Sequence, residues 1–237
     1  MSGIGGQENR GEPSREERAG PWAAIGLVVA LAGPPLLASA PMQKIYAQFD
    51  PAFGIFLGQA LLWLVLGLAL ACLVVGEKLP LSSVGIVAPR WRSVGLGLAI
   101  GAGVYASLLA IVSILLHFHL FEIGTKQVEA VTSWPLWLRL FALVTAGVVE
   151  EALYRGYAIE RLTALTGRRW LSASIALAGF SIAHVPFWGL GALATPLVGG
   201  SFFTLIYLWR RDLVACMVAH IAVDSVGLIV APALGVQ

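Results

Sequence analysis

The sequence predicts an all-α membrane protein, a polytopic transmembrane helix bundle. Its 237 residues are 58% hydrophobic and only 12% charged, about half the charged share of an ordinary soluble domain, and their mean hydropathy is +0.84. Several apolar segments reach the roughly 20 residues that a helix needs to cross a hydrocarbon core of about 30 Å. Basic residues alternate between rich and poor connections along the chain. These observations predict seven spans, with eight as the alternative count.

The predicted spans take up most of the chain. In order they cover residues 22–40, 52–75, 94–117, 136–164, 170–185, 192–209 and 213–233. Arginine and lysine are concentrated before the first span and in every second connection after it, whereas the other connections carry at most one such residue. Because cytoplasmic loops carry the excess of basic residues, this alternation predicts a cytoplasmic N-terminus and a C-terminus outside.

The chain is expected to divide into a tail and a bundle. Residues 1–20 are polar and rich in Gly and Glu, which predicts a disordered cytoplasmic tail; residues 21–237 form the transmembrane bundle. The first span ends in Ala38-Ser39-Ala40, so a cleaved signal sequence is the alternative to a retained helix. Its length and Pro41, which would follow the cut, favour a retained helix.

The charge balance limits the partners. A formal net charge of +2 with scattered basic residues is not the basic stripe of a nucleic-acid-binding protein. The expected partner common to every span is therefore the lipid bilayer, and no nucleic acid is expected.

A few polar side chains lie inside the predicted spans, where each carboxylate costs at least about 2.5 kcal/mol. They are Glu150, Glu151 and Arg155 in the fourth span, His184 in the fifth, and His220 with Asp224 in the seventh. At a rise of about 1.5 Å per residue, four of them lie roughly 12 to 21 Å from the predicted cytoplasmic boundary: Glu150, His184, His220 and Asp224. We therefore expect them to meet in one layer near the middle of the membrane.

Helical spacing separates the two adjacent glutamates. Glu151 and Arg155 are four residues apart and face the same side of a helix, whereas Glu150 projects about 100° away. Arg155 can then neutralise Glu151 and leave Glu150 as a proton acceptor. The alternative is an ion-pair cluster that only ties helices together. His220 and Asp224 repeat the four-residue spacing, as do Phe180 and His184.

These residues form three short motifs in a known order. Glu150-Glu151-Ala-Leu-Tyr-Arg155 fits EExxxR, Phe180-Ser-Ile-Ala-His184 fits FxxxH, and His220-Ile-Ala-Val-Asp224 fits HxxxN/D. The chain resembles the CPBP family, which is similar to the type II CAAX prenyl endopeptidases and includes bacteriocin-processing and self-immunity proteins. The resemblance covers residues 136–228, the expected protease-like core of the bundle.

The resemblance implies an intramembrane endopeptidase that cleaves a peptide or protein substrate, which can be lipidated. The residues that it makes catalytic are Glu150, His184, His220 and Asp224. By this resemblance, Glu150 and His184 would activate a water molecule, and the other two would stabilise the oxyanion. Glu151 and Arg155 would support the site, and Phe180 would pack against it and exclude water. The expected location is the cell membrane of a bacterium.

Asp224 leaves three interpretations open, because many family members have Asn at this position. A protonated Asp224 could donate to the oxyanion, Asp224 could orient His220, or the four catalytic residues could bind zinc. The zinc-protease motif HExxH is absent, so the favoured interpretation has no metal cofactor. Outside proteolysis, the alternatives are a proton-coupled transporter, since buried Glu, Asp and His also form proton relays, and a non-catalytic immunity or scaffold protein.

Overall fold

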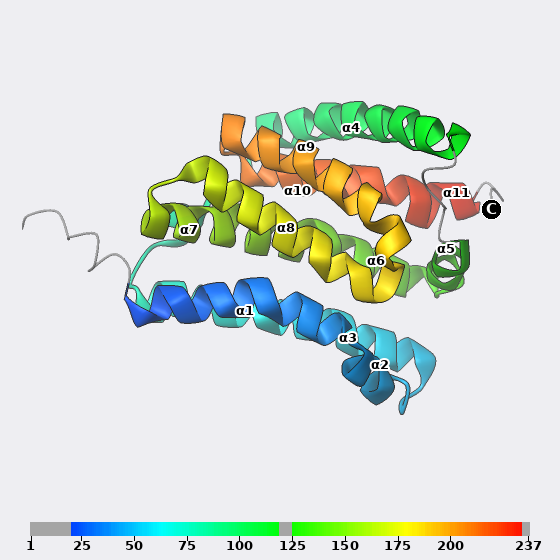
Figure 1. Ribbon diagram of the computed structural model, residues 1–237, viewed down its shortest axis with the longest axis horizontal. Helices are drawn as coiled ribbons and strands as arrows, with labels where there is room; N and C mark the ends of the chain where they lie inside the picture. The colour runs from blue at the N-terminus through cyan, green and yellow to red at the C-terminus, as the bar shows by residue number, and fades with distance from the viewer. Residues whose placement is uncertain (1–19, 119–124, 234–237) are drawn as a thin grey trace, which may run out of the picture.

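The computed structural model describes residues 20–118 and 125–233, and these residues form helices and turns without a strand. The predicted disordered tail, residues 1–20, lies almost entirely outside the described residues. The helices lie side by side along the long axis of the molecule (Figure 1). The all-α fold class is therefore confirmed.

The N-terminal helices form one edge of the bundle (Figure 1). They are α1 (Pro21–Ala38), α2 (Ala40–Tyr46), α3 (Pro51–Ala71) and its π-helical extension η2 (Cys72–Gly76). α3 begins where the Asp50 carboxylate accepts hydrogen bonds from the amides of Ala52 and Phe53 at 3.0 and 3.2 Å, an N-cap that satisfies two free amides. α1 packs against α3 along its length and against α8.

The middle of the chain supplies the opposite edge and the central helix. A short 3-10 turn, η3 (Leu81–Val84), leads to α4 (Trp91–His117), and α5 (Thr125–Thr132) follows. Three stretches then join without a break: α6 (Leu136–Thr145), the π-helix η4 (Ala146–Ala158) and α7 (Ile159–Thr166). Together they form the long central helix that carries the adjacent glutamates.

The C-terminal helices close the bundle. They are α8 (Arg169–Trp188), η5 (Leu190–Leu193), α9 (Ala194–Arg210), α10 (Leu213–Ser225), η6 (Val226–Val230) and α11 (Ala231–Ala233). α10 packs most extensively against α4, where Gly97 and Gly101 lie against its backbone. The main buried core lies where η4 meets α1, α3, α8 and α10.

Five helical stretches are long and apolar enough to cross a membrane. They are Pro21–Ala38, Pro51–Gly76, Trp91–His117, Arg169–Trp188 and Leu213–Val230, and each coincides with a predicted span. The other two predicted spans are also helical. The stretch 136–164 contains six charged residues, and α9 has only 17 residues. An integral membrane protein is thus supported, whereas the count of seven and the orientation stay predictions.

Candidate active site

The adjacent glutamates lie on a π-helix, not on the α-helix that the sequence predicted. From Ala146 to Ala158 the backbone forms the wider turns of a π-helix, in which each amide bonds to a carbonyl five residues earlier. Short π-helical turns within α-helices are frequent at functional sites, and η4 is a longer stretch of this kind. The expected separation of the two side chains nevertheless holds. Glu151 is fully buried, whereas about a fifth of the Glu150 side chain is exposed.

The predicted pairing of Glu151 with Arg155 is confirmed. One guanidinium nitrogen of Arg155 donates to Glu151 Oε1 at 2.8 Å, and another donates to the backbone carbonyl of Gly200 at 3.0 Å. The guanidinium also lies over the ring of Phe180, with its carbon 4.2 Å from the ring centroid. A buried arginine held by a carboxylate, a carbonyl and an aromatic face has one fixed position, and it anchors the site.

Glu151 also holds His220. The same oxygen, Oε1, lies 2.8 Å from His220 Nδ1, and the opposite ring nitrogen, Nε2, lies 3.4 Å from Asp224 Oδ2. The ring of Phe203 stacks on the imidazole, with centroids 4.9 Å apart and planes at 24°. His220 is therefore fixed in position and in ring orientation.

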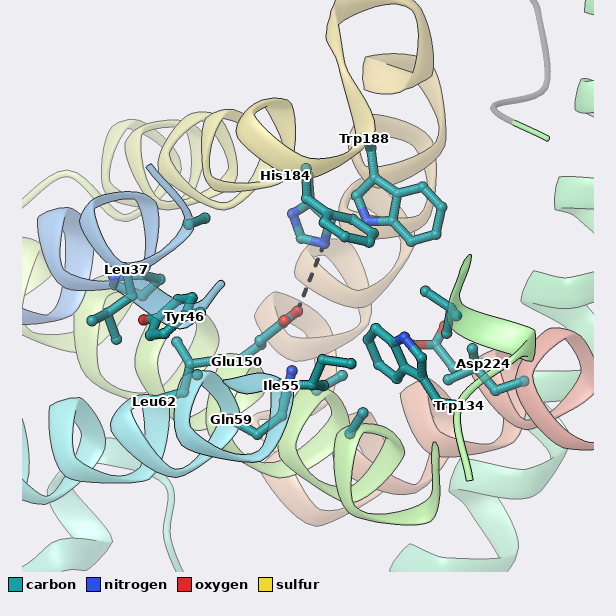
Figure 2. A pocket seen from close by; sticks show the side chains of 18 of the residues that line it. Leu37, Tyr46, Ile55, Gln59, Leu62, Trp134, Glu150, His184, Trp188 and Asp224 are labelled. Carbon is teal, nitrogen blue, oxygen red and sulfur yellow. Dashed lines mark ion pairs between the residues drawn. The ribbon is translucent and has the colours of Figure 1, made fainter. Parts of the chain in front are cut away.

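His184 is oriented by its own helix. Its Nδ1 lies 2.8 Å from the carbonyl oxygen of Phe180. Because a carbonyl can only accept, Nδ1 carries the proton in this bond, and the other nitrogen faces away from the backbone. That nitrogen, Nε2, lies 3.9 Å from Glu150 Oε2. Figure 2 shows the two side chains pointing toward one another.

Phe180 lies at the centre of these groups. Its ring centroid is 4.6 Å from that of His184 and 6.4 Å from that of His220. The ring also contacts the guanidinium of Arg155 and packs edge-on against Tyr154. Only 3% of the residue is exposed. Phe180 therefore packs among these groups, and its role in excluding water stays a prediction.

The four expected catalytic residues line one cavity of about 300 Å³ (Figure 2). Other parts of its wall come from α1, α2, α3, the turn before α6 and the end of α8. They include Leu37, Tyr46, Ile55, Gln59, Trp134 and Trp188. The structure therefore brings together three motifs that lie on η4, α8 and α10. Glu151, Arg155 and Phe180 lie behind the cavity wall as its support.

Sequence reasoning missed the contribution of α9 and of the N-terminal helices. Gly200 and Phe203 of α9 contact Arg155 and His220, yet neither belongs to a motif or to a polar pattern. A Cβ at Gly200 would lie 2.9 Å from the Phe180 ring, so glycine permits the close approach of the two helices. The tyrosine and glutamines of the cavity wall likewise carry no sequence signal.

The side chains as arranged do not form a single metal-ligand set. Among the described residues, no group of three or more His, Cys, Asp and Glu could hold a metal ion. The four instead form two pairs, Glu150 with His184 and Asp224 with His220, and both nitrogens of His220 already face carboxylates. Zinc binding would require these pairs to rearrange.

The fold and the site define a class: an integral membrane helical bundle with paired carboxylates and imidazoles that line a cavity. Residues 132–226 match the model of the family described as type II CAAX prenyl endopeptidase Rce1-like. This segment contains all three motifs and is less than half of the 237 residues. The match confirms the family resemblance and indicates a protease acting within the membrane. No curated protein and no solved structure matches the chain.

Proposed function

We propose that the protein is an intramembrane endopeptidase in which Glu150 is the general base. One observation carries this proposal: Glu150 and His184 both line the cavity, with Oε2 and Nε2 3.9 Å apart, and Oε2 has no hydrogen-bond partner among the described residues. Two acceptors at this separation can both lie within about 2.8 Å of one water oxygen. That geometry suits a water molecule poised for attack.

The proposed reaction uses one group that accepts and later returns a proton, and a second group that positions the water. Glu150 removes a proton as the water oxygen bonds to the carbonyl carbon of the scissile peptide, and His184 positions the water through Nε2. The carbon–nitrogen bond then breaks, and Glu150 returns the proton to the leaving amine nitrogen. A positioned base of this kind contributes about 10²- to 10⁴-fold to the rate.

His220 is the proposed electrophilic partner. Its Nδ1 donates to Glu151, whose carboxylate is also bound by Arg155, so Nε2 faces Asp224 and the cavity. An imidazole that donates from both nitrogens is a cation, and a fixed cation stabilises the negative oxygen of the tetrahedral intermediate. Asp224 thus orients His220 in this proposal, which is one of the three interpretations left open by the sequence.

Replacing Asp224 by Asn separates the zinc interpretation from the two interpretations without a metal. The Asn oxygen can still accept from His220 Nε2, and its amide can donate to the oxyanion, so we expect Asp224→Asn to retain or gain activity. A zinc site would lose a ligand, and both metal content and activity would fall. Elemental analysis of the purified variant, together with its cleavage rate, distinguishes the two outcomes.

The proposed substrate is a peptide segment of a secreted, lipidated or membrane-anchored chain in a bacterial plasma membrane. The residues that line the cavity include two carboxylates, Glu150 and Asp224, but no lysine or arginine within the described part of the chain. Acidic residues next to the scissile bond are therefore disfavoured by like-charge repulsion. Substrate trapping with a Glu150→Gln variant would identify the segment.

The rival function is proton-coupled transport. A transporter opens its polar site to the two membrane faces in turn, and in this structure the second half of η4 fills the space beyond Glu151 with fully buried side chains. Cleavage and proton-uptake assays in proteoliposomes distinguish the two functions. Cleavage that is lost in Glu150→Ala supports the protease, and proton uptake that depends on Glu150 without any cleavage would establish the rival.

A further inference from the structure

The cavity lies toward one end of the bundle. Besides the catalytic residues, its wall uses Gln43 and Tyr46 of α2, Gly54 near the start of α3, Trp134 before α6 and Trp188 at the end of α8. These elements meet at the end of the molecule where α2 and α5 lie, which we call the cavity end (Figure 1). Tryptophan and tyrosine at such positions are typical of a membrane–water interface.

The other end is filled. Following Glu151 along the central helix, the side chains of Leu153, Tyr154, Tyr157 and Ile159 are at most 1% exposed. They pack into the main core with α1, α3 and α8. This packing separates the catalytic residues from the far end of the bundle, so the cavity end offers the route to Glu150.

Basic residues gather at the filled end, which we call the basic end. It contains the α3–α4, α7–α8 and α9–α10 connections (Figure 1). Its basic residues are Lys78, Arg90, Arg92, Arg161, Arg168, Arg169, Arg210 and Arg211. At the cavity end the described elements carry three, Lys44, Lys126 and Arg139. Because cytoplasmic loops hold the excess of basic residues, the basic end belongs on the cytoplasmic side.

We propose that the catalytic cavity opens to the non-cytoplasmic face of the membrane. Its substrate is then a polypeptide segment exposed on that face, either on a secreted peptide or on the outer flank of a membrane anchor. This substrate class rests on the proposed protease function, whereas the side of access rests only on the position of the cavity and of the basic residues. The two claims can therefore fail separately.

Thiol labelling tests the side of access. In a background with Cys72→Ala and Cys216→Ala, single cysteines replace Gln43 in the cavity wall, Gln48 beside it and Arg168 at the basic end, all three exposed. A membrane-impermeant maleimide applied to intact bacterial cells should label Gln43→Cys and Gln48→Cys and should not label Arg168→Cys. Inverted membrane vesicles should reverse the pattern.

The same labelled proteins connect access with catalysis. Modification of Gln43→Cys from outside should abolish cleavage of the substrate that trapping has identified. Modification of Gln48→Cys, which lies outside the cavity wall, should leave the cleavage rate unchanged. Labelling of Gln43→Cys only in inverted vesicles, or only after detergent solubilisation, overturns the proposal. Because labelling needs no catalytic activity, a protein that cleaves nothing still gives a decisive answer on access.

Discussion

His220 shows how much of the site depends on single contacts. Its two nitrogens face Glu151 and Asp224 at 2.8 and 3.4 Å, and Phe203 covers one face of the ring. Glu151 is in turn held by Arg155. A chain of buried, mutually fixed polar groups of this kind keeps a reactive group in position without reorganisation during the reaction.

Phe203 is predicted to be a positioning residue. Stacked aromatic pairs contribute about 0.5 to 1.5 kcal/mol beyond area burial, so Phe203→Leu should lower kcat by about two- to tenfold, with KM little changed. Steady-state kinetics on an identified substrate measures this. The neighbouring Phe202→Leu makes the same change in a partly buried ring that does not stack on His220 and serves as the control. Equal effects of the two substitutions would contradict a specific role for the stacking.

At the residue scale, the site residues that could be predicted from the sequence are the polar and charged groups that are costly to place in a membrane. Glu151 and Arg155 could be paired from their spacing alone, and Glu150 could be separated from them. Phe203 could not be predicted, because its role depends on how α9 packs against α10. Its aromatic ring is also ordinary for a membrane helix, where apolar side chains carry little positional information.

Among the helices, the π-helical stretch η4 was not predicted from the sequence. Its residues have an ordinary apolar pattern, and the wider turn is visible only in the backbone. The predicted pairing of Glu151 with Arg155 nevertheless holds, because the two side chains remain in contact on the wider turn. The lining of the cavity by α1, α2 and α3 was also unpredicted, since nothing in those helices distinguishes wall residues from lipid-facing ones.

The contact between α4 and α10 positions His220 and Asp224. A methyl group at Gly97 would lie 2.7 Å from the carbonyl oxygen of Ala215 and from Val218, so Gly97→Ala forces the helices apart. We expect a loss of stability of about 1 to 3 kcal/mol and reduced activity. Thermal unfolding in detergent measures the first effect. Gly103 lies on the same helix with open space around it, so Gly103→Ala should lower neither stability nor activity. A Gly97→Ala variant with the stability of the wild type would contradict this packing.

The ion pair between Glu77 and Arg161 ties the end of η2 to α7 at 3.2 Å. Burial raises the pKa of Glu77 above its ordinary value of 4.5, and the nearby guanidinium of Arg161 lowers it. In Arg161→Gln the pKa of folded Glu77 should rise further. The folded variant then keeps a proton that the unfolded chain releases, so its stability relative to the wild type should fall as pH increases above 4.5.

Thermal unfolding of Arg161→Gln and of the wild type between about pH 5 and pH 8 measures this loss of stability. The loss should approach the roughly 3 to 5 kcal/mol typical of a broken buried ion pair. The Glu77→Gln/Arg161→Gln double variant should lack the added pH dependence. A pH-independent difference between Arg161→Gln and the wild type would show that the ion pair is not the cause.

For the whole molecule, the arrangement of the ends links fold to function. The basic end is filled and the cavity end is open, so the two ends of the bundle differ, and the proposed catalytic groups lie between them. Composition and loop charges predicted the membrane setting and this asymmetry. Which end the cavity faces could not be predicted from the sequence, because the wall residues come from helices that are far apart in the chain.

The central claim is that Glu150 is the base of an intramembrane protease, and cleavage by purified protein in proteoliposomes tests it most directly. Glu150→Gln preserves the size of the side chain and its place in the cavity but cannot accept the proton from water. The proposal predicts a loss of about 10²- to 10⁴-fold in kcat, with substrate binding and thermal stability retained. Cleavage by Glu150→Gln at the wild-type rate would contradict it.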